Sequence, residues 1–139
     1  MFKNILLAVD GSDHSSRALS YAKNMAEKYR ATLWLIHVFE RTSDLLGYED
    51  FEKFYARRKC AGQMVIDKAK EMLGEPAVEL REELLEGPEA DAILNFAKNN
   101  HADIIVMGSR GMGALKGLLL GSVSRKVIHF SACPVMVVH

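Results

Sequence analysis

A glycine-rich segment near the end of the chain has the composition of a phosphate-binding loop. It runs from Gly108 to Ser124 and carries five glycines within 14 residues. Glycine lets backbone N–H groups approach an anion without a Cβ atom in the way. Gly121 and Ser122 stand where a helix is expected to begin, and the first N–H groups of a helix lack internal partners and favour negative charge. The segment therefore predicts a phosphate site, with hydroxyl donors from Ser122 and Ser124 and a cation from Arg110.

Two common phosphate-binding motifs are absent from the sequence. The P-loop pattern GxxxxGK[ST] does not occur. The dinucleotide fingerprint GxGxxG starts at Gly111, but the glycine that should complete it, Gly117, comes one residue late. NAD binding is therefore not expected. An alternative is that the glycines only form a tight turn and a connection. Five glycines just before a serine-rich helix start favour a ligand-binding loop instead.

The elements that must position this segment follow from hydrophobic periodicity. The expected strands are Ile5–Val9, Ala31–Phe39, Val78–Leu84, Ala102–Met107 and Pro134–Val138. The expected helices follow Ser12, cover Glu49–Leu73, start at Gly87-Pro88 and cover Gly121–Ser131. Strands that alternate with helices predict an α/β fold, an open parallel five-stranded sheet with helices on both faces. Ligands bind such sheets beyond the carboxyl ends of the strands, here at Asp10 and Gly108.

Three finer expectations concern the helices. Ser12 or Asp13 is expected to cap the first helix, and Pro88 is expected at the first position of the third. Gly74 fits the end of the long second helix. The apolar side of that helix is expected to contain Phe51, Phe54, Tyr55, Ala61, Val65 and Met72.

Composition limits the class of protein. The 139 residues fit one domain, residues 1–139, with the composition of a soluble globular protein. Lys+Arg and Asp+Glu both number 18, so no basic excess indicates nucleic-acid binding. We expect no membrane segment, because no apolar stretch approaches the roughly 20 residues of a membrane span. Cys60 and Cys133 fit reduced thiols in a cytoplasmic protein, and the scattered histidines lack the spacing of metal ligands.

Four positions of the glycine-rich segment match a known family motif. Gly108, Gly111, Gly121 and Ser122 fit the spacing G-x2-G-x9-G-[S/T]. This spacing resembles the ATP-binding motif of the universal stress protein family. The resemblance runs from end to end of the chain, in the segments Ile5–Ser12, His37-Val38, Glu86–Pro88, Asp103–Gly111 and Cys133–Val138.

The resemblance implies a sheet of strand order 3-2-1-4-5 with a nucleotide across the ends of strands one and four. Asp10 would accept hydrogen bonds from the ribose hydroxyls. The other residues that it assigns are Ala8, Val9 and Val38 at the adenine, Met107 and Gly108 at base and ribose, and Gly111, Gly121, Ser122, Val123 and Ser124 at the phosphates. It also implies a Mg²⁺ or Mn²⁺ ion on the ATP phosphates and a homodimer through the final strand, Pro134–Val138.

The expected function is an ATP-binding regulatory module of the stress response, with slow or no hydrolysis. The alternative is a slow ATPase or nucleotidyl-transfer enzyme, which needs a base and a placed nucleophile. Asp10 is the one base candidate near the loop, and the resemblance already assigns it to the ribose. A dimerising protein with a vestigial pocket is disfavoured by the intact motif. Asp10 as a helix cap and Arg110 as a solvated side chain remain open alternatives, and His37 is expected to be packed rather than catalytic.

Overall fold

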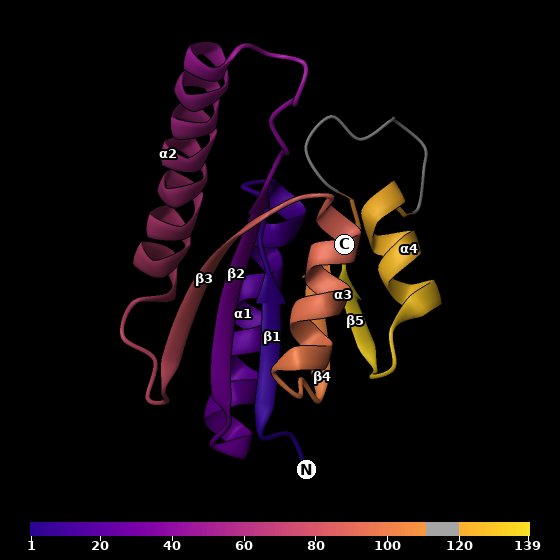
Figure 1. Cartoon of the computed structure of the whole chain (residues 1–139). Coiled ribbons are helices and arrows are strands. Elements are labelled where there is room, and N and C mark those ends of the chain that lie inside the picture. The colour runs from indigo at the N-terminus through magenta and orange to yellow at the C-terminus, as the bar shows by residue number, and fades with distance from the viewer. Residues whose placement is uncertain (111–119) are drawn as a thin grey trace.

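A computed structural model describes residues 1–110 and 120–139 (Figure 1). Within these residues, strands and helices alternate along the chain, as the hydrophobic periodicity predicts. The strands are β1 Asn4–Ala8, β2 Thr32–Phe39, β3 Leu80–Glu86, β4 Ile104–Gly108 and β5 Val135–Val138. The helices are α1 Asp13–Tyr29, α2 Tyr48–Leu73, α3 Glu89–Asn99 and α4 Ser122–Phe130. None of the helices in the described part of the chain has both the length and the apolar character needed to cross a membrane.

The five strands form one parallel sheet of order β3-β2-β1-β4-β5, which confirms the predicted α/β fold. β1 lies at the centre and pairs with β2 on one side and β4 on the other. The chain moves outward from β1 to β3 in one direction and then from β4 to β5 in the opposite direction. The connections that leave β1 and β4 therefore diverge, and a crevice opens between them at the carboxyl edge.

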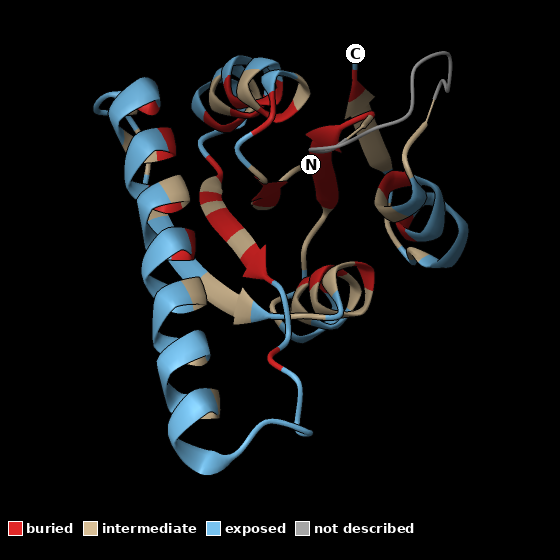
Figure 2. Cartoon of the chain, turned by 90° about the horizontal axis from the view of Figure 1, so that it is seen from above, coloured by how far each residue is buried: buried red, intermediate tan, exposed pale blue. Residues whose placement is uncertain are grey.

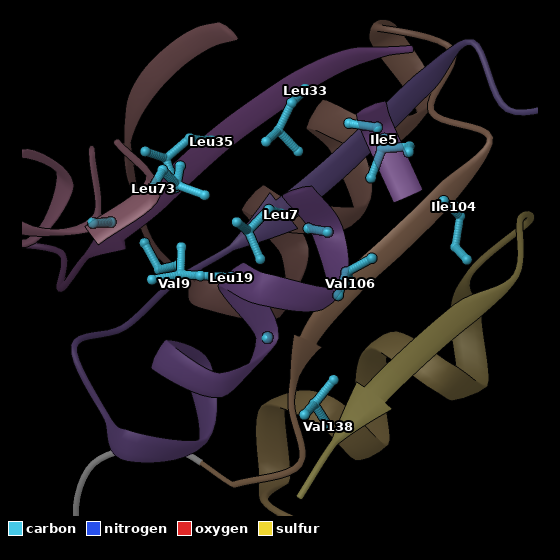
Figure 3. Packing of buried hydrophobic residues seen from close by; sticks show 14 of the residues in the cluster. Ile5, Leu7, Val9, Leu19, Leu33, Leu35, Leu73, Ile104, Val106 and Val138 are labelled. Carbon is cyan, nitrogen blue, oxygen red and sulfur yellow. The ribbon is translucent and has the colours of Figure 1, made fainter. Parts of the chain in front are cut away.

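Both faces of the sheet are covered by helices. Side chains alternate along β1, so Ile5 and Leu7 point to the face covered by α1 and α2, whereas Leu6 and Ala8 point to the face covered by α3 and α4. Figure 3 shows the first of these clusters, where Leu19 of α1 lies close to Leu7. Seen from above, buried positions line the sheet and the inner sides of the helices (Figure 2). The continuous apolar runs of β1 and β4 follow from burial on both faces.

The apolar face expected for α2 was partly wrong. The buried positions are Gly62, Ile66, Ala69 and Leu73, at helical spacing. Phe54 and Met72 are instead 40% and 53% exposed. The first half of α2 extends beyond the carboxyl edge of the sheet (Figure 1), so its aromatic residues have less apolar surface to pack against.

The helix starts show which residues act as caps. The Ser12 hydroxyl oxygen accepts a hydrogen bond from the Ser15 N–H at 3.2 Å, so Ser12 is the N-cap of α1. Pro88 is also an N-cap, not the first helical residue as expected. Its ψ of 141° is extended, and its carbonyl accepts the first helical hydrogen bond, from the Ala92 N–H at 2.9 Å.

Gly108 is required where α1 crosses the end of β4. A Cβ atom at this position would lie 2.7 Å from the Ser15 nitrogen and 2.8 Å from the His14 carbonyl carbon. Both are backbone atoms, which cannot move without displacing the start of α1. This close approach gives Gly108 a packing role that is independent of any ligand.

We expect Gly108→Ala to lower the free energy of unfolding by about 2–4 kcal/mol, because the added methyl group must displace the helix backbone. Urea unfolding followed by circular dichroism measures the change. Gly47→Ser is the control, since nothing lies within 4 Å of a Cβ atom there and Ser suits the N-cap of α2. A Gly108→Ala protein as stable as the wild type would show that the contact can relax without cost.

Candidate functional site

A cleft of about 660 Å³ opens at the carboxyl edge of the sheet, where β1 and β4 lie side by side. It is lined by the ends of these strands, the first turns of α3 and α4, and the middle of α2. Its position is the crevice that the reversal of strand order produces. Its volume is in the range of sites for small molecules and cofactors.

The structure brings together eleven of the twelve residues predicted for the nucleotide. The residues that line the cleft are Ala8, Val9, Asp10, Val38, Met107, Gly108, Arg110, Gly121, Ser122, Val123 and Ser124. The twelfth residue, Gly111, lies outside the described residues. Residues from four separate parts of the sequence therefore meet around one space.

The carbonyl oxygen of Ser109 joins the end of β4 to the start of α4. It accepts a hydrogen bond from the Gly121 N–H at 2.7 Å and another from the Ser124 hydroxyl, also at 2.7 Å. Ser124 is 2% exposed, and its hydroxyl group also lies 3.2 Å from the Gly121 carbonyl oxygen. In this structure the Ser124 hydroxyl donates to the Ser109 carbonyl oxygen, and its expected contact with a phosphate stays a prediction. The sequence pattern contained no signal for this role, because it depends on the position of Ser109.

The start of α4 presents backbone N–H groups at the cleft. Gly121 is its N-cap, with extended backbone angles. In the part of the chain that the structure describes, no acceptor is found for the backbone N–H groups of Ser122, Val123 and Ser124. The Ser122 side chain is exposed. The first N–H groups of a helix and the positive end of its dipole are features that favour a nearby anion.

Asp10 follows the end of β1 and is half-buried. Its Oδ1 accepts a hydrogen bond from the Ser12 N–H at 2.9 Å, which stabilises the turn before α1. Ser12 rather than Asp10 is the N-cap of the helix. No donor among the described residues reaches Oδ2, so one carboxylate oxygen of Asp10 is available in the cleft.

Arg110 is held at the edge of the cleft by His14 of α1. Its Nη2 lies 3.2 Å from His14 Nε2, and His14 Nδ1 lies 3.2 Å from the Ser109 hydroxyl oxygen. Arg17 Nη2 also lies 3.2 Å from His14 Nδ1, so guanidinium donors face both ring nitrogens, of which only one can accept in a neutral imidazole. Burial lowers the pKa of His14, and the nearby Arg110 and Arg17 lower it further. Arg110 is therefore partly ordered beside the cleft, and His14 is a residue that sequence patterns did not indicate.

The opposite part of the cleft is apolar. Val38 and Met107 are buried and line it together with Ile93 of α3. His37 also lines it, and its Nδ1 donates a hydrogen bond to the Val9 carbonyl oxygen at 2.7 Å. This hydrogen bond holds the imidazole ring of His37 in place, as expected for a packed histidine. The lining of the cleft thus combines buried apolar side chains with the polar start of α4.

Glu89, the first residue of α3, is a cleft residue that the sequence analysis missed. Burial raises its pKa to about 7, and the Asp10 carboxylate contributes to the same shift. The position could have been noticed, because an acidic residue at a helix start beside the carboxyl edge of a parallel sheet faces the ligand crevice. The partial burial of Glu89 could not be predicted from the sequence, because it depends on how α3 packs.

We expect Glu89→Gln to stabilise the free protein more at pH 8 than at pH 5. The pKa of Glu89 is raised on folding, so its contribution to stability is complete below about pH 4.5 and is lost as the pH rises through about 7. The difference in unfolding free energy between variant and wild type should grow by about 1–3 kcal/mol over this interval. Urea unfolding at both pH values measures it. Glu86→Gln removes an exposed carboxylate and controls for the loss of charge, and an equal pH dependence of both variants would contradict the shift.

These features define a class of protein, an α/β domain with an open parallel sheet and a ligand-sized cleft at the point where the strand order reverses. The sequence model described as "Universal stress protein family" matches residues 1–139. The chain belongs to the universal stress protein family.

Relatives and solved structures agree with this assignment. A Thermus aquaticus protein, "Universal stress protein in QAH/OAS sulfhydrylase 3′ region", is 45% identical over 138 residues, which cover 99% of each chain. The structure of hypothetical protein MJ0577 superposes with a TM-score of 0.88 at 28% identity, over 99% of this chain and 96% of the other. A universal stress protein in complex with cAMP superposes with a TM-score of 0.70 at 27% identity, over 99% of this chain and 97% of the other.

Proposed function

We propose that this universal stress protein binds ATP in the cleft between β1 and β4 and acts as a nucleotide-occupied regulatory module with slow or no hydrolysis. The observation that carries the proposal is the meeting of the G-x2-G-x9-G-[S/T] segment with Asp10 at one cleft. These residues are far apart in sequence, and the fold places them at the crevice where open parallel sheets bind ligands.

The start of α4 is suited to the phosphates. The N–H groups of Ser122, Val123 and Ser124 have no acceptor among the described residues, and the Ser122 hydroxyl adds a donor. The guanidinium of Arg110 lines the same cleft and adds positive charge. Charge-assisted hydrogen bonds from such donors are about twice as strong as neutral ones. We also propose that ATP binds with Mg²⁺ or Mn²⁺, because Mg²⁺ is usually held by substrate phosphates and few protein ligands.

The rest of the cleft is suited to a nucleoside. Val38 and Met107 offer buried apolar surface for adenine, with Ala8 and Val9 at the end of β1 beside them. The available Oδ2 of Asp10 offers an acceptor for a ribose hydroxyl. The cleft therefore offers apolar surface for a base, an acceptor for a sugar hydroxyl and donors for phosphates.

The relatives support an adenine nucleotide as the ligand class. The universal stress protein described in complex with cAMP has the same fold at 27% identity. Because it is a relative, its ligand supports the proposal and does not by itself assign one to this chain. A cytoplasmic location is part of the proposal, and the free thiols of Cys60 and Cys133 agree with a reducing compartment.

The enzymatic alternative gains one candidate base from the structure. Glu89 lines the cleft, and its pKa of about 7 suits proton transfer near neutral pH. Its electrostatic partner, however, is Asp10, which we assign to the ribose, rather than a group at the start of α4. With Asp10 assigned to the ribose, we assign Glu89 to the sugar as well, and this assignment favours binding over hydrolysis of the terminal phosphate.

We expect nucleotide-stripped protein to bind about one Mg·ATP per chain in calorimetry, and we expect Gly121→Asp to weaken binding at least about tenfold. An aspartate there places a like charge against the phosphates, while it remains a good N-cap for α4. Gly47→Asp is the matched control, since Gly47 is the glycine N-cap of α2 and lies outside the cleft. It should bind ATP as the wild type does.

Two results would contradict this proposal. Folded wild-type protein that binds no ATP would overturn the function. Equal ATP affinity of Gly121→Asp and Gly47→Asp would contradict the proposed position of the phosphates at the start of α4. Turnover by the wild type well above about one per minute, lost in Glu89→Gln, would support the enzymatic alternative instead.

We also propose a homodimer through β5. This strand is at one edge of the sheet, and an open edge presents unpaired backbone groups that can pair with another chain. Phe130, at the end of α4 just before this strand, is 62% exposed. Light scattering should give a mass near twice 15.5 kDa, which falls on dilution. A mass of one chain at every concentration would contradict the dimer without affecting the proposal for ATP.

A further inference from the structure

Glu89 has an unusual environment for a carboxylate in a ligand cleft. It is half-buried at the start of α3, and its side chain accepts no hydrogen bond from the described residues. A carboxylate removed from water without donors is unfavourable unless a partner arrives. The start of a helix favours negative charge, which offsets only part of this cost.

The cationic side chains near the cleft, among the described residues, contact groups other than Glu89. The charged and titratable groups that line it with Glu89 are Asp10, His37, Glu40, Arg58 and Arg110. Arg58 donates to the Arg41 carbonyl oxygen at 2.6 Å, and Arg110 contacts His14. On the neighbouring helix α4, Lys126 pairs with Asp91 at 3.1 Å. None of these contacts supplies a donor to Glu89.

The group that interacts with Glu89 electrostatically is the Asp10 carboxylate. Asp10 uses Oδ1 for the Ser12 N–H, and its Oδ2 has no donor among the described residues. Both carboxylates line the same cleft, and each has an oxygen with no donor among the described residues. Such a pair can accept hydrogen bonds from a ligand that carries two adjacent hydroxyl donors. The 2′,3′-diol of a ribose has this arrangement, and two charge-assisted hydrogen bonds would offset the repulsion between the carboxylates.

We propose that Glu89 is a specificity-determining residue that accepts a hydrogen bond from one hydroxyl of the ribose diol while Asp10 accepts one from the other, so that the cleft selects ribonucleotides over deoxynucleotides. The inference rests on the proposed nucleotide function and adds a residue and a selectivity to it. A deoxynucleotide that lacks the hydroxyl facing Glu89 leaves this buried acceptor unpaired, which is costly.

This arrangement makes ribonucleotide affinity depend on pH. Burial and Asp10 raise the pKa of Glu89 to about 7, so near neutral pH a substantial fraction of the free protein carries a protonated Glu89. The carboxylate is the stronger acceptor, and therefore ribonucleotide binding favours loss of the proton. Affinity should rise as the pH increases from 6 to 8, by up to about tenfold if the protonated form binds poorly.

The test is calorimetry with Mg·ATP and its 2′-deoxy and 3′-deoxy analogues at pH 6, 7 and 8, on wild type, Glu89→Gln and Glu86→Gln. Glu86→Gln is the matched control, because Glu86 is exposed and does not line the cleft. Comparison between proteins at one pH cancels the titration of the nucleotide itself. We expect Glu89→Gln to bind ATP several-fold more weakly than the control at pH 8 and nearly equally at pH 6. We also expect it to discriminate less against one of the two deoxy analogues.

The outcomes separate this inference from the proposed function. If the wild type and Glu89→Gln bind ATP with the same pH dependence and the same discrimination against the deoxy analogues, the role of Glu89 is overturned. The proposed ATP site is then unaffected. If the ATP affinity of the wild type, relative to that of Glu89→Gln, instead increases as the pH falls to 6, the diol assignment is overturned. Glu89 would then bind the ligand as a protonated donor. Folded wild type that binds no nucleotide at any pH overturns both.

Discussion

The parallel pairing of β1 with both β2 and β4 is the constraint on which the other features depend. It buries β1 on both faces, which requires its continuous apolar run. It also turns the connections after β1 and β4 away from each other, so the cleft follows from strand order before any polar residue is considered. Asp10, at the end of β1, and the segment after Gly108 are then the two parts of the chain that must face this space.

The glycines and serines of the cleft have structural roles beside the binding roles that we propose. Gly108 lets α1 cross the end of β4, and the Ser109 carbonyl oxygen holds the start of α4 through Gly121 and Ser124. These contacts fix the N–H groups of α4 before a ligand arrives, and such preorganisation lowers the cost of binding. A change at these positions is therefore expected to alter stability as well as the proposed binding, and the matched control variants separate the two effects.

Local sequence patterns were sufficient for the order of elements, the parallel sheet and the two strand ends at the cleft. Asp10 and Ser122 could be predicted because strand ends and helix starts are local features. The strand order and the apolar residues of the cleft came from the family resemblance. Glu89, His14 and the hydroxyl group of Ser124 could not be assigned, because their roles depend on which helices pack together. The apolar face of α2 was misjudged for a related reason, since periodicity does not show where a long helix extends past the sheet.

The central claim is that one nucleotide lies across the carboxyl ends of β1 and β4 with its phosphates at the start of α4. The most direct measurement is a titration of ¹⁵N-labelled protein with Mg·ATP, followed through the backbone amide resonances. The account predicts saturable shifts that are largest at Ser122, Val123 and Ser124 and also present at Asp10. Shifts confined to the groove between α1 and α2, near Met64 and Met72, would contradict it.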